Sequence, residues 1–193
     1  MKIGVLALQG AFAEHIAVLK ELGVEAVEVR LPEQLEGLDG LIIPGGESTS
    51  ITLLMKNYRF ADVMGGLAKD GFPIFGTCAG MIVLARELSD AGGVEPVGAM
   101  DIKVARNAFG RQVDSFEASL SIPVLGKKPF TAVFIRAPKI ESIGKNVEVL
   151  AKLDDGTVVA ARQGKLLVTS FHPELTDDTR LHRYFLDMVA GKR

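Results

Sequence analysis

The first ninety residues alternate between two hydrophobic patterns. Residues 3–8 form a continuous apolar run, which is typical of a strand covered on both faces. Residues 24–31, 40–43 and 72–76 are also predicted to be strands. Segments with apolar side chains at helical spacing follow them, at residues 12–22, 48–58, 61–69 and 79–88. Gly23 follows the first of these segments, where helices commonly end. Strands that alternate with helices predict a mostly parallel α/β sheet.

The second half of the chain has a different pattern, with short strand-like segments separated by turns. These segments lie at residues 100–106, 116–122, 131–136, 147–153, 157–162 and 166–171. Asp155-Gly156 and Gln163-Gly164 favour tight hairpins, which predicts antiparallel pairing. Residues 177–189 are expected to form a closing helix. The sequence has no linker rich in Pro, Ser or Gly, so we predict one domain over residues 1–193, with the antiparallel strands extending a single sheet system.

Composition narrows the class of protein. With 193 residues, 48% of them hydrophobic, the chain can form a full core without disulfide or metal support. A net charge of −2 argues against a nucleic-acid partner or an anionic membrane surface. One cysteine forms no internal disulfide, which fits a reducing compartment. The opening apolar run stops at Gln9, and no stretch approaches the ~20 apolar residues of a membrane span. We therefore expect a soluble, cytoplasmic protein.

Cys78 is a candidate nucleophile because of its neighbours. It stands in Gly76-Thr77-Cys78-Ala79-Gly80, between a predicted strand and a predicted helix, which is the form of a nucleophile elbow with cysteine in place of serine. The helix that begins behind it would favour a thiolate, and the backbone N–H of Ala79 would be available to an oxyanion. The alternative is that Cys78 is a small buried apolar residue, the usual role of a lone cysteine.

A thiolate nucleophile needs a base, and the chain has three histidines. His15 lies on the first predicted helix and His182 on the last, and we interpret each as a surface or packing residue. His172 stands at the end of a predicted strand, separated from Glu174 by Pro173. In extended backbone, residues i and i+2 point the same way. The Glu174 carboxylate can therefore orient the His172 imidazole, as in other triads.

A glycine-rich loop, residues 44–49, occupies another strand-to-helix junction. Its paired glycines, Gly45 and Gly46, would let backbone approach a ligand closely and present N–H groups to an anion. A simple turn explains the pair nearly as well. Because α/β sheets bind ligands at their strand ends, we expect this loop to lie beside Cys78 and to form part of a site.

Six ordered motifs together resemble class I, triad-type glutamine amidotransferases, and more closely the family of glutaminase subunits of pyridoxal 5'-phosphate synthases. The motifs are LALQG at residues 6–10, PGGESTS at 44–50, GTCAGMI at 76–82, RNAFGRQ at 106–112, FIRAP at 134–138 and SFHPE at 170–174. The resemblance covers essentially the whole chain. Wider class I members usually carry glutamine four positions after the cysteine, where this chain has Ile82. That departure argues against the histidine-pathway and anthranilate glutaminases.

The resemblance implies a three-layer fold and a set of site residues. Cys78 would be the nucleophile, with His172 and Glu174 completing the triad. Glutamine would be bound by residues of three segments, namely Gly46, Glu47, Ser48, Arg106, Ile135 and Arg136. Backbone donors at Gly46 and Ala79 would form the oxyanion hole, and Gln9 and Gly10 would lie at the partner interface.

The chemistry of glutamine agrees with this set. Glutamine carries an α-ammonium and an α-carboxylate, so a pocket with Glu47 and an arginine is chemically sensible, although the sequence leaves open which group contacts which end. Without the resemblance, a structural ion pair would explain Arg106 and Arg136, and a strand-ending turn would explain Gln9-Gly10.

The expected reaction is acyl transfer from the glutamine side chain to Cys78, followed by hydrolysis. No metal or cofactor is needed, and the sequence offers no His/Cys cluster to hold a metal. The chain also has no P-loop and no dinucleotide fingerprint, so an acceptor enzyme should receive the ammonia. The resemblance implies a synthase subunit that combines ammonia with ribose 5-phosphate and glyceraldehyde 3-phosphate, activates the glutaminase, and assembles as twelve of each subunit.

Three other interpretations stay open at this stage. The chain could be a glutaminase that serves another pathway, against which Ile82 and the segments 106–112 and 134–138 count. It could be a cysteine hydrolase of the DJ-1/protease type, although such proteins lack the distant His-x-Glu on a late strand. It could also be a catalytically inactive binding or regulatory module, against which the intact triad residues count.

Overall fold

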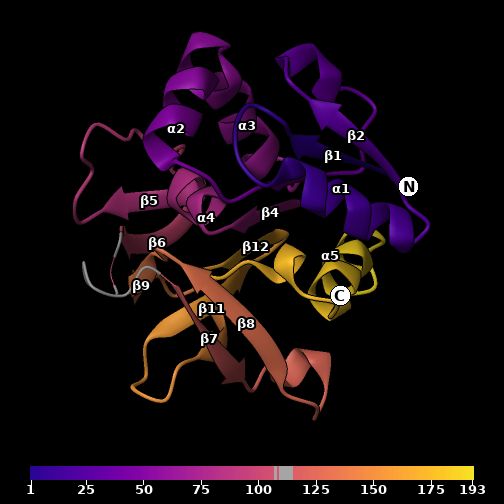
Figure 1. The fold of residues 1–193 in the computed structure, drawn as a ribbon. Coiled ribbons are helices and arrows are strands. Elements are labelled where there is room, and N and C mark those ends of the chain that lie inside the picture. The colour runs from indigo at the N-terminus through magenta and orange to yellow at the C-terminus, as the bar shows by residue number, and fades with distance from the viewer. Residues whose placement is uncertain (107, 109–114) are drawn as a thin grey trace.

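The protein folds around one large sheet (Figure 1). The structure, a computed structural model, describes residues 1–106, 108 and 115–193. Its strands are β1 (Lys2–Leu6), β2 (Glu25–Val29), β3 (Gly40–Ile43), β4 (Ile74–Thr77), β5 (Ala85–Leu88), β6 (Met100–Ala105), β7 (Ser115–Leu120), β8 (Phe130–Ile135), β9 (Lys139–Ile143), β10 (Glu148–Lys152), β11 (Val158–Gln163) and β12 (Leu166–Thr169). In this part of the chain, ten strands form the sheet in the order β2-β1-β3-β4-β12-β11-β9-β6-β5, with β10 paired to β11, and β7 and β8 form a separate two-stranded sheet.

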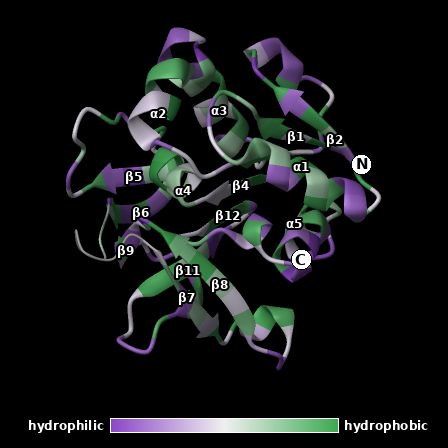
Figure 2. Cartoon of the chain, viewed as in Figure 1, coloured by the Kyte–Doolittle hydropathy of each residue, from purple (hydrophilic) through white to green (hydrophobic). Residues whose placement is uncertain are grey.

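Helices cover both faces of the sheet. The α-helices are α1 (Phe12–Glu21), α2 (Ser48–Asn57), α3 (Phe60–Lys69), α4 (Ala79–Leu84) and α5 (Arg180–Val189), and the 3-10 turns are η1 (Pro32–Leu35), η2 (Pro123–Leu125) and η3 (Pro173–Leu175). Buried side chains of α2, α3 and α4 share one apolar cluster, and those of α1 and α5 share another. The two groups therefore lie on opposite faces of the sheet, and helices such as α1 and α2 carry both hydrophobic and hydrophilic positions (Figure 2). Among the described residues, no helix is long and apolar enough to span a bilayer.

The parallel half of the sheet accounts for the continuously apolar runs. β3, β4 and β12 are buried at every residue, since helices or other strands cover both of their faces. β12 forms near the end of the chain but pairs in parallel with β4, and the register places Thr169 opposite Thr77. The carboxyl ends of these two strands therefore lie side by side, although ninety-two positions separate the paired threonines.

Most of the antiparallel half continues the same sheet, as predicted, but β7 and β8, which were expected to extend that sheet, form a separate two-stranded sheet. β11 pairs antiparallel with β12 and β10, and β6 pairs antiparallel with β9. Gly164, in the two-residue turn between β11 and β12, has a φ of +56°, which glycine tolerates without strain. The β7–β8 hairpin lies against the face that α1 and α5 cover, where Phe134 meets Phe171 with ring centroids 5.5 Å apart. The predicted fold class, a mostly parallel sheet with helices on both faces and an antiparallel extension, is confirmed.

Two elements differ from the sequence prediction. The helix predicted over residues 79–88 ends at Leu84, and residues 85–88 form β5. This segment pairs with β6, and ion pairs from Arg86 to Asp101 (2.5 Å) and from Lys103 to Glu87 (2.6 Å) join the two strands. Strand β9 was not predicted, and it lies between β6 and β11. In both cases pairing with distant strands decides the structure, which a local pattern does not reveal.

Candidate active site

Cys78 lies at a sharp bend between β4 and α4, with φ 49° and ψ −102°. This is a rare conformation for a residue with a side chain, and such strain gathers at functional sites. A Cβ on Gly76 would press on the backbone of Gly80, and a Cβ on Gly80 would overlap the carbonyl oxygen of Ile43. The two flanking glycines therefore permit a bend that other residues would block. The N–H of Cys78 donates to the Thr169 carbonyl at 2.8 Å, which ties the bend to β12.

His172 and Glu174 follow β12, the strand beside β4. The Nδ1 atom of His172 lies 2.7 Å from Oε1 of Glu174, and both side chains are buried. The backbone differs from the extended geometry that the sequence indicated, because Pro173 begins η3 and a 3-10 turn brings Glu174 back under the ring. The backbone N–H of His172 donates to the backbone carbonyl of Val133 at 2.8 Å. Strand β8 therefore also helps to fix the position of the His172 side chain.

Electrostatics favour a charged imidazole beside the sulfur. Burial would lower the pKa of His172, but hydrogen bonds and charges from Cys78 and Glu174 outweigh burial and raise it to about 10. The pKa of Glu174 is lowered, because the neighbouring His15 and His172 more than offset the burial that would raise it. At neutral pH the pair is therefore an imidazolium held by a carboxylate, which can give a proton to a leaving group.

A cavity of about 450 Å³ opens in front of Cys78. Nearly every residue that the sequence placed in the site lines it, and the full set is Gly46, Glu47, Ser48, Cys78, Ala79, Ile82, Arg106, Ile135, Arg136 and His172. Glu174 lies behind His172 and does not reach the cavity wall. Ala79 is the first residue of α4, so its N–H has no acceptor within the helix. The cavity thus joins a sulfur, an imidazole, a helix N-terminus and two arginines.

Gln9 and Gly10 do not line this cavity but support its glycine loop. The side-chain oxygen of Gln9 accepts the Glu47 N–H at 2.7 Å, and the Ala11 N–H donates to the Gly45 carbonyl at 3.0 Å. Gly10 has a φ of +104°, and a Cβ there would overlap that same carbonyl oxygen. Only glycine at position 10 therefore allows the loop after β1 to pack against the loop after β3.

Glu47 has a structural role in addition to its place on the cavity wall. Its carboxylate accepts the N–H groups of Thr49 and Ser50 at 2.9 and 2.7 Å, and the Ser50 hydroxyl at 2.6 Å. It therefore caps the N-terminus of α2. The Ser50 hydroxyl and the two backbone N–H groups lower the pKa of Glu47 to about 2, despite some opposing desolvation. The side chain is thus already occupied by the helix, which the sequence analysis did not foresee.

The remaining predicted residues reach the cavity from the antiparallel half. Arg106 donates to the Ala91 carbonyl at 2.7 Å and to the Thr49 hydroxyl at 3.3 Å, so hydrogen bonds hold its guanidinium in place. Arg136 is exposed, with a φ of 43°, and the preceding Ile135 carbonyl lies 3.8 Å from the Cys78 sulfur. Most of the motif at 106–112 lies outside the described residues.

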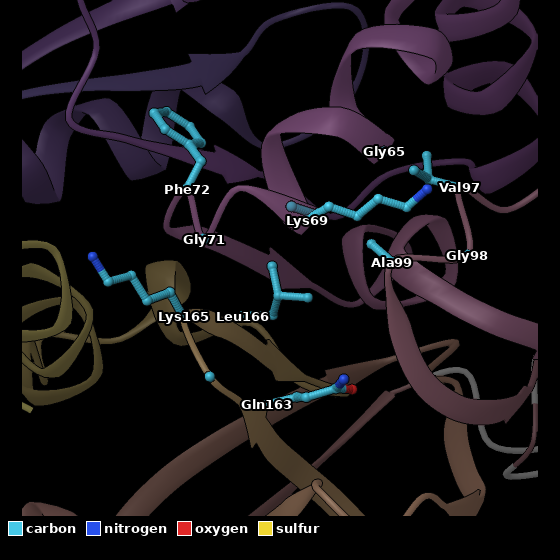
Figure 3. Close-up of a pocket in the computed structure, with 12 residues that line it drawn as sticks. Gly65, Lys69, Gly71, Phe72, Val97, Gly98, Ala99, Gln163, Lys165 and Leu166 are labelled. Carbon is cyan, nitrogen blue, oxygen red and sulfur yellow. The ribbon is translucent and has the colours of Figure 1, made fainter.

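A second cavity, of about 510 Å³, lies at the other end of the sheet (Figure 3). Its walls include Phe72, just before β4, and Leu166, the first residue of β12, so it faces the amino ends of the two central strands. Lys69 and Lys165 supply its charged groups (Figure 3), and no cysteine or histidine lines it. Ligands of parallel sheets bind at the carboxyl ends of strands. The slightly smaller cavity at Cys78 is therefore the candidate active site.

Comparison with known proteins agrees with this geometry. A sequence profile of the SNO glutamine amidotransferase family matches residues 5–191. The chain belongs to the SNO glutamine amidotransferase family.

Relatives in this family that carry the name pyridoxal 5'-phosphate synthase subunit PdxT match almost end to end. One from Dehalococcoides mccartyi strain BAV1 is 62% identical over 190 residues, covering 98% of this chain and 97% of the relative. One from Herpetosiphon aurantiacus is 58% identical, covering 97% of this chain and 100% of the relative. The family recognised from the six motifs is therefore confirmed.

Solved structures place the fold in the same group. A glutamine amidotransferase with 51% identity superposes with a TM-score of 0.92, covering 98% of this chain and 100% of that one. A glutamine amidotransferase from Thermotoga maritima has 14% identity and a TM-score of 0.64, covering 100% of this chain and 86% of that one. The second likeness concerns the fold alone.

In this SNO family member, sequence reasoning missed three buried residues behind the candidate site. His15 from α1 and His182 from α5 are fully buried, and Nδ1 of His15 lies 2.9 Å from Nε2 of His182. Nε2 of His15 lies 3.1 Å from the Thr77 hydroxyl, which also accepts the Gly45 N–H at 3.1 Å. A signal existed, because His15 shares the inner face of its helix with Val18 and Leu19. Within the described residues, no group of acidic, cysteine and histidine side chains is suited to a metal ion.

Proposed function

We propose that this amidotransferase hydrolyses L-glutamine to L-glutamate and ammonia and delivers the ammonia to the synthase subunit of pyridoxal 5'-phosphate synthase. The observation that carries the proposal is the meeting of three groups at one cavity. They are a cysteine held in a strained bend, an imidazole beside its sulfur, and a carboxylate 2.7 Å from that imidazole. The names of the relatives support the choice of pathway.

The first half of the proposed reaction forms a thioester. The Cys78 thiolate attacks the side-chain amide carbon of glutamine, and the amide oxygen gains negative charge. The backbone N–H groups of Gly46 and Ala79, both on the cavity wall, would stabilise that oxyanion. His172 gives its proton to the amide nitrogen, the C–N bond breaks, and ammonia leaves. The raised pKa of His172 supports this step, since the ring holds the proton before the reaction begins.

The second half regenerates the cysteine. Neutral His172 removes a proton from water, and the resulting hydroxide attacks the thioester carbon. The C–S bond breaks, glutamate forms, and the sulfur departs as a thiolate beside the imidazolium. Glu174 stays ionised throughout, because its role is to hold the ring in one tautomer and orientation. Its lowered pKa supports this role.

The amino-acid end of glutamine would lie against the charged wall of the cavity. Arg106 and Arg136 line it from the antiparallel half, and two guanidinium groups suit an α-carboxylate. Glu47 supplies negative charge for the α-ammonium, although its carboxylate also caps α2. We therefore propose that glutamine binding tightens the packing between the α2 N-terminus and Arg106.

The partner would dock beside Gln9 and Gly10. These residues support Gly45 and Glu47 through hydrogen bonds, so a protein bound to them would act directly on the glycine loop. This arrangement supports activation by the synthase, with ammonia passing between the two sites in a complex of twelve copies of each subunit. Free ammonia would otherwise be protonated and lost in water.

The deciding experiment measures transfer of labelled nitrogen. Glutamine labelled with ¹⁵N in its side chain is supplied with ribose 5-phosphate, glyceraldehyde 3-phosphate and the cognate synthase. Wild type should place the label in pyridoxal 5'-phosphate, whereas Cys78→Ala should place none there and release no glutamate. Added ammonium should restore synthesis with Cys78→Ala. Normal glutamate release by Cys78→Ala would refute the assigned nucleophile.

A pathway control accompanies this experiment. Glutamate release is measured with the chain alone, with its cognate synthase, and with an acceptor enzyme of another amidotransferase pathway. Activation by the cognate synthase alone supports the proposal. Equal rates with and without that synthase would contradict the coupling, and activation by the other acceptor would transfer the chain to that pathway.

A further inference from the structure

All three histidines of the chain meet under the carboxyl ends of β4 and β12. His172 lines the cavity, whereas His15 and His182 lie behind it with no exposed surface. They come from α1 and α5, the two helices on the same face of the sheet. Two fully buried imidazoles next to a reactive carboxylate need an explanation, since burying polar groups costs free energy unless they form hydrogen bonds.

The two oxygens of Glu174 have different surroundings. Oε1 lies 2.7 Å from Nδ1 of His172. Oε2 is buried and has no hydrogen-bond partner within the described part of the chain. Nε2 of His15 lies 3.4 Å from it. That distance is long for a hydrogen bond, and catalytic hydrogen bonds of free enzymes often tighten once substrate binds.

The hydrogen-bond partners of His15 and His182 favour one pair of tautomers. If Nδ1 of His15 carried the proton, its bare Nε2 would face the carboxylate, and the buried N–H on Nδ1 of His182 would have no acceptor. If Nε2 of His15 carries it, that nitrogen lies 3.1 Å from the Thr77 hydroxyl and 3.4 Å from Oε2 of Glu174, and Nε2–H of His182 donates to Nδ1 of His15. The second arrangement leaves no buried donor without an acceptor on either ring, and it places a donor rather than a bare nitrogen beside Oε2 of Glu174, so it costs less than the first.

We propose that His15 is a positioning residue of the glutaminase site, whose Nε2–H holds Oε2 of Glu174 so that Oε1 stays aimed at His172. The terminal torsion of a glutamate is broad, so one hydrogen bond leaves the carboxylate free to turn. A second donor on the other oxygen removes that freedom. The kinetic part of this inference rests on the proposed function, whereas the structural part concerns the carboxylate alone.

The charges around this group determine how pH enters. Glu174 is faced by His172 from its own segment and by His15 from α1, and His182 from α5 stands behind His15. Burial lowers the pKa of His15, with Glu174 opposing, His172 adding to the lowering and Glu14 opposing weakly. His15 therefore acts as a neutral donor near pH 7. A neutral Nε2–H still favours the ionised form of the carboxylate 3.4 Å away, so removing His15 should raise the pKa of Glu174 and move the acid limb of activity to higher pH.

Three variants separate positioning from simple support of the fold. His15→Leu removes both ring nitrogens at similar volume, and His15→Gln keeps an N–H where Nε2 stood. Phe185→Leu is the matched packing control, because Phe185 is fully buried on the same face and contacts Phe75, the ring that also packs against His15. Each variant is assayed in complex with the cognate synthase, with the active fraction counted by labelling Cys78 with a glutamine-analogue electrophile.

The kinetic arm has defined outcomes. His15→Leu should lower kcat about ten- to a hundredfold, the loss expected from one hydrogen bond to a charged group, with KM for glutamine unchanged. Its acid limb should move upward in pH. His15→Gln should recover most of kcat, and Phe185→Leu should keep both kcat and the pH profile. A His15→Leu enzyme with wild-type kcat and pH profile would overturn the inference, as would a Phe185→Leu enzyme with the same defects.

A spectroscopic arm works without turnover. With only three histidines in the chain, ¹⁵N-histidine NMR resolves every ring nitrogen. At pH 7, His15 should carry its proton on Nε2, and His15→Leu should shift the Nδ1–H resonance of His172. A proton on Nδ1 of His15, or an unchanged His172 resonance, would overturn the inference. An inactive wild-type complex would instead refute the proposed function, and the NMR result would still decide the role of His15.

Discussion

At the scale of single residues, the site depends on two backbone requirements. Cys78 occupies a strained conformation at the bend after β4, and Gly45 leaves space for the ring of His172. A Cβ on Gly45 would overlap Cε1 of that ring and lie 3.2 Å from the Cβ of Cys78. The sulfur and the imidazole can therefore approach each other only because the glycine loop has no side chain at this point.

The charge of His172 should depend on Cys78. In Cys78→Ala the imidazole loses a hydrogen bond and a neighbouring charge, both of which raise its pKa. We expect its pKa to fall clearly below the wild-type value of about 10. Histidine NMR titration of both proteins measures this directly. An unchanged titration in the variant would mean that Glu174 alone sustains the imidazolium.

Gly45→Ala should damage catalysis more than folding. The added methyl would displace the His172 ring, and misplacing a catalytic group by about 1 Å can cost about a hundredfold in rate. We expect kcat to fall by at least tenfold in the synthase complex. Gly66→Ala is the control, because a Cβ at this position in α3 meets nothing within 4 Å. That control should retain its activity and gain up to about 1 kcal/mol of stability.

Sequence reasoning succeeded for residues that stand in contiguous motifs and failed for those that meet through packing. Cys78, Gly46 and Glu47 belong to short loops at strand ends, and the structure places them at one cavity. His15 and His182 are 167 positions apart, and their contact exists only once α1 and α5 pack on the same face. A single helical pattern marks a histidine as inward-facing but does not say what it meets.

At the scale of elements, the start of α2 combines fold and function. Glu47 caps this helix from the cavity wall, so the segment that follows the glycine loop begins at a fixed point. α4 likewise begins at a fixed point, because its first residue, Ala79, directly follows the bend at Cys78. Both helices present their N-termini to the cavity, where the partial positive charge suits an anionic intermediate.

Glu47→Ala should cost about 1 kcal/mol of unfolding free energy, the typical value of an N-cap. The pKa of Glu47 is depressed to about 2 in the folded state, so its contribution is present above its ordinary value near 4.5. It is lost as pH falls from about 4.5 towards 2. Urea unfolding of both proteins at pH 7 and pH 3 should give a smaller difference at pH 3. Glu36→Ala, at an exposed position outside α2, should show little effect at either pH.

The predicted elements were most accurate where the run was continuously apolar or the turn chemistry was specific. The strand at residues 40–43 was located correctly, and both hairpins were found. The tight turn lies at residues 164–165, one position later than predicted, and Asp155-Gly156 stands in a five-residue loop between Lys152 and Val158. The prediction of a helix over residues 85–88 was wrong because Arg86 and Glu87 favour a helix locally, whereas pairing with β6 holds the segment in an extended conformation. β9 was not predicted because Lys139, Glu141 and Ser142 leave it no continuous apolar run and it is too short to show a clear alternation.

At the scale of the whole molecule, buried histidines make stability depend on pH. Burial lowers the pKa of His182 to about 3, and the charge of His15 acts in the same direction. In the unfolded chain, His182 becomes protonated below about pH 6.5, whereas in the folded chain it stays neutral down to about pH 3. The contribution of neutral His182 to the unfolding free energy is therefore fully present above about pH 6.5, and it declines as the pH falls from 6.5 to about 3.

His182→Gln should flatten this dependence. The wild-type unfolding free energy should fall between pH 6.5 and 3 by an amount to which His182 contributes at most about 5 kcal/mol. The variant should start lower at pH 7, since it loses the contact with His15, but should lose less on acidification. Urea unfolding across this range compares the two slopes. Parallel curves would mean that His182 titrates alike in both states.

The parallel pairing of β4 with β12 also determines when the candidate site can form during synthesis of the chain. A ribosome completes the cysteine elbow by residue 80, yet the strand that delivers the imidazole begins at residue 166. Until that strand pairs with its neighbour, the His172 imidazole does not lie beside the sulfur of Cys78. Under the proposed function, an incomplete chain would therefore be unable to hydrolyse glutamine, and ammonia release would be confined to molecules that have finished folding.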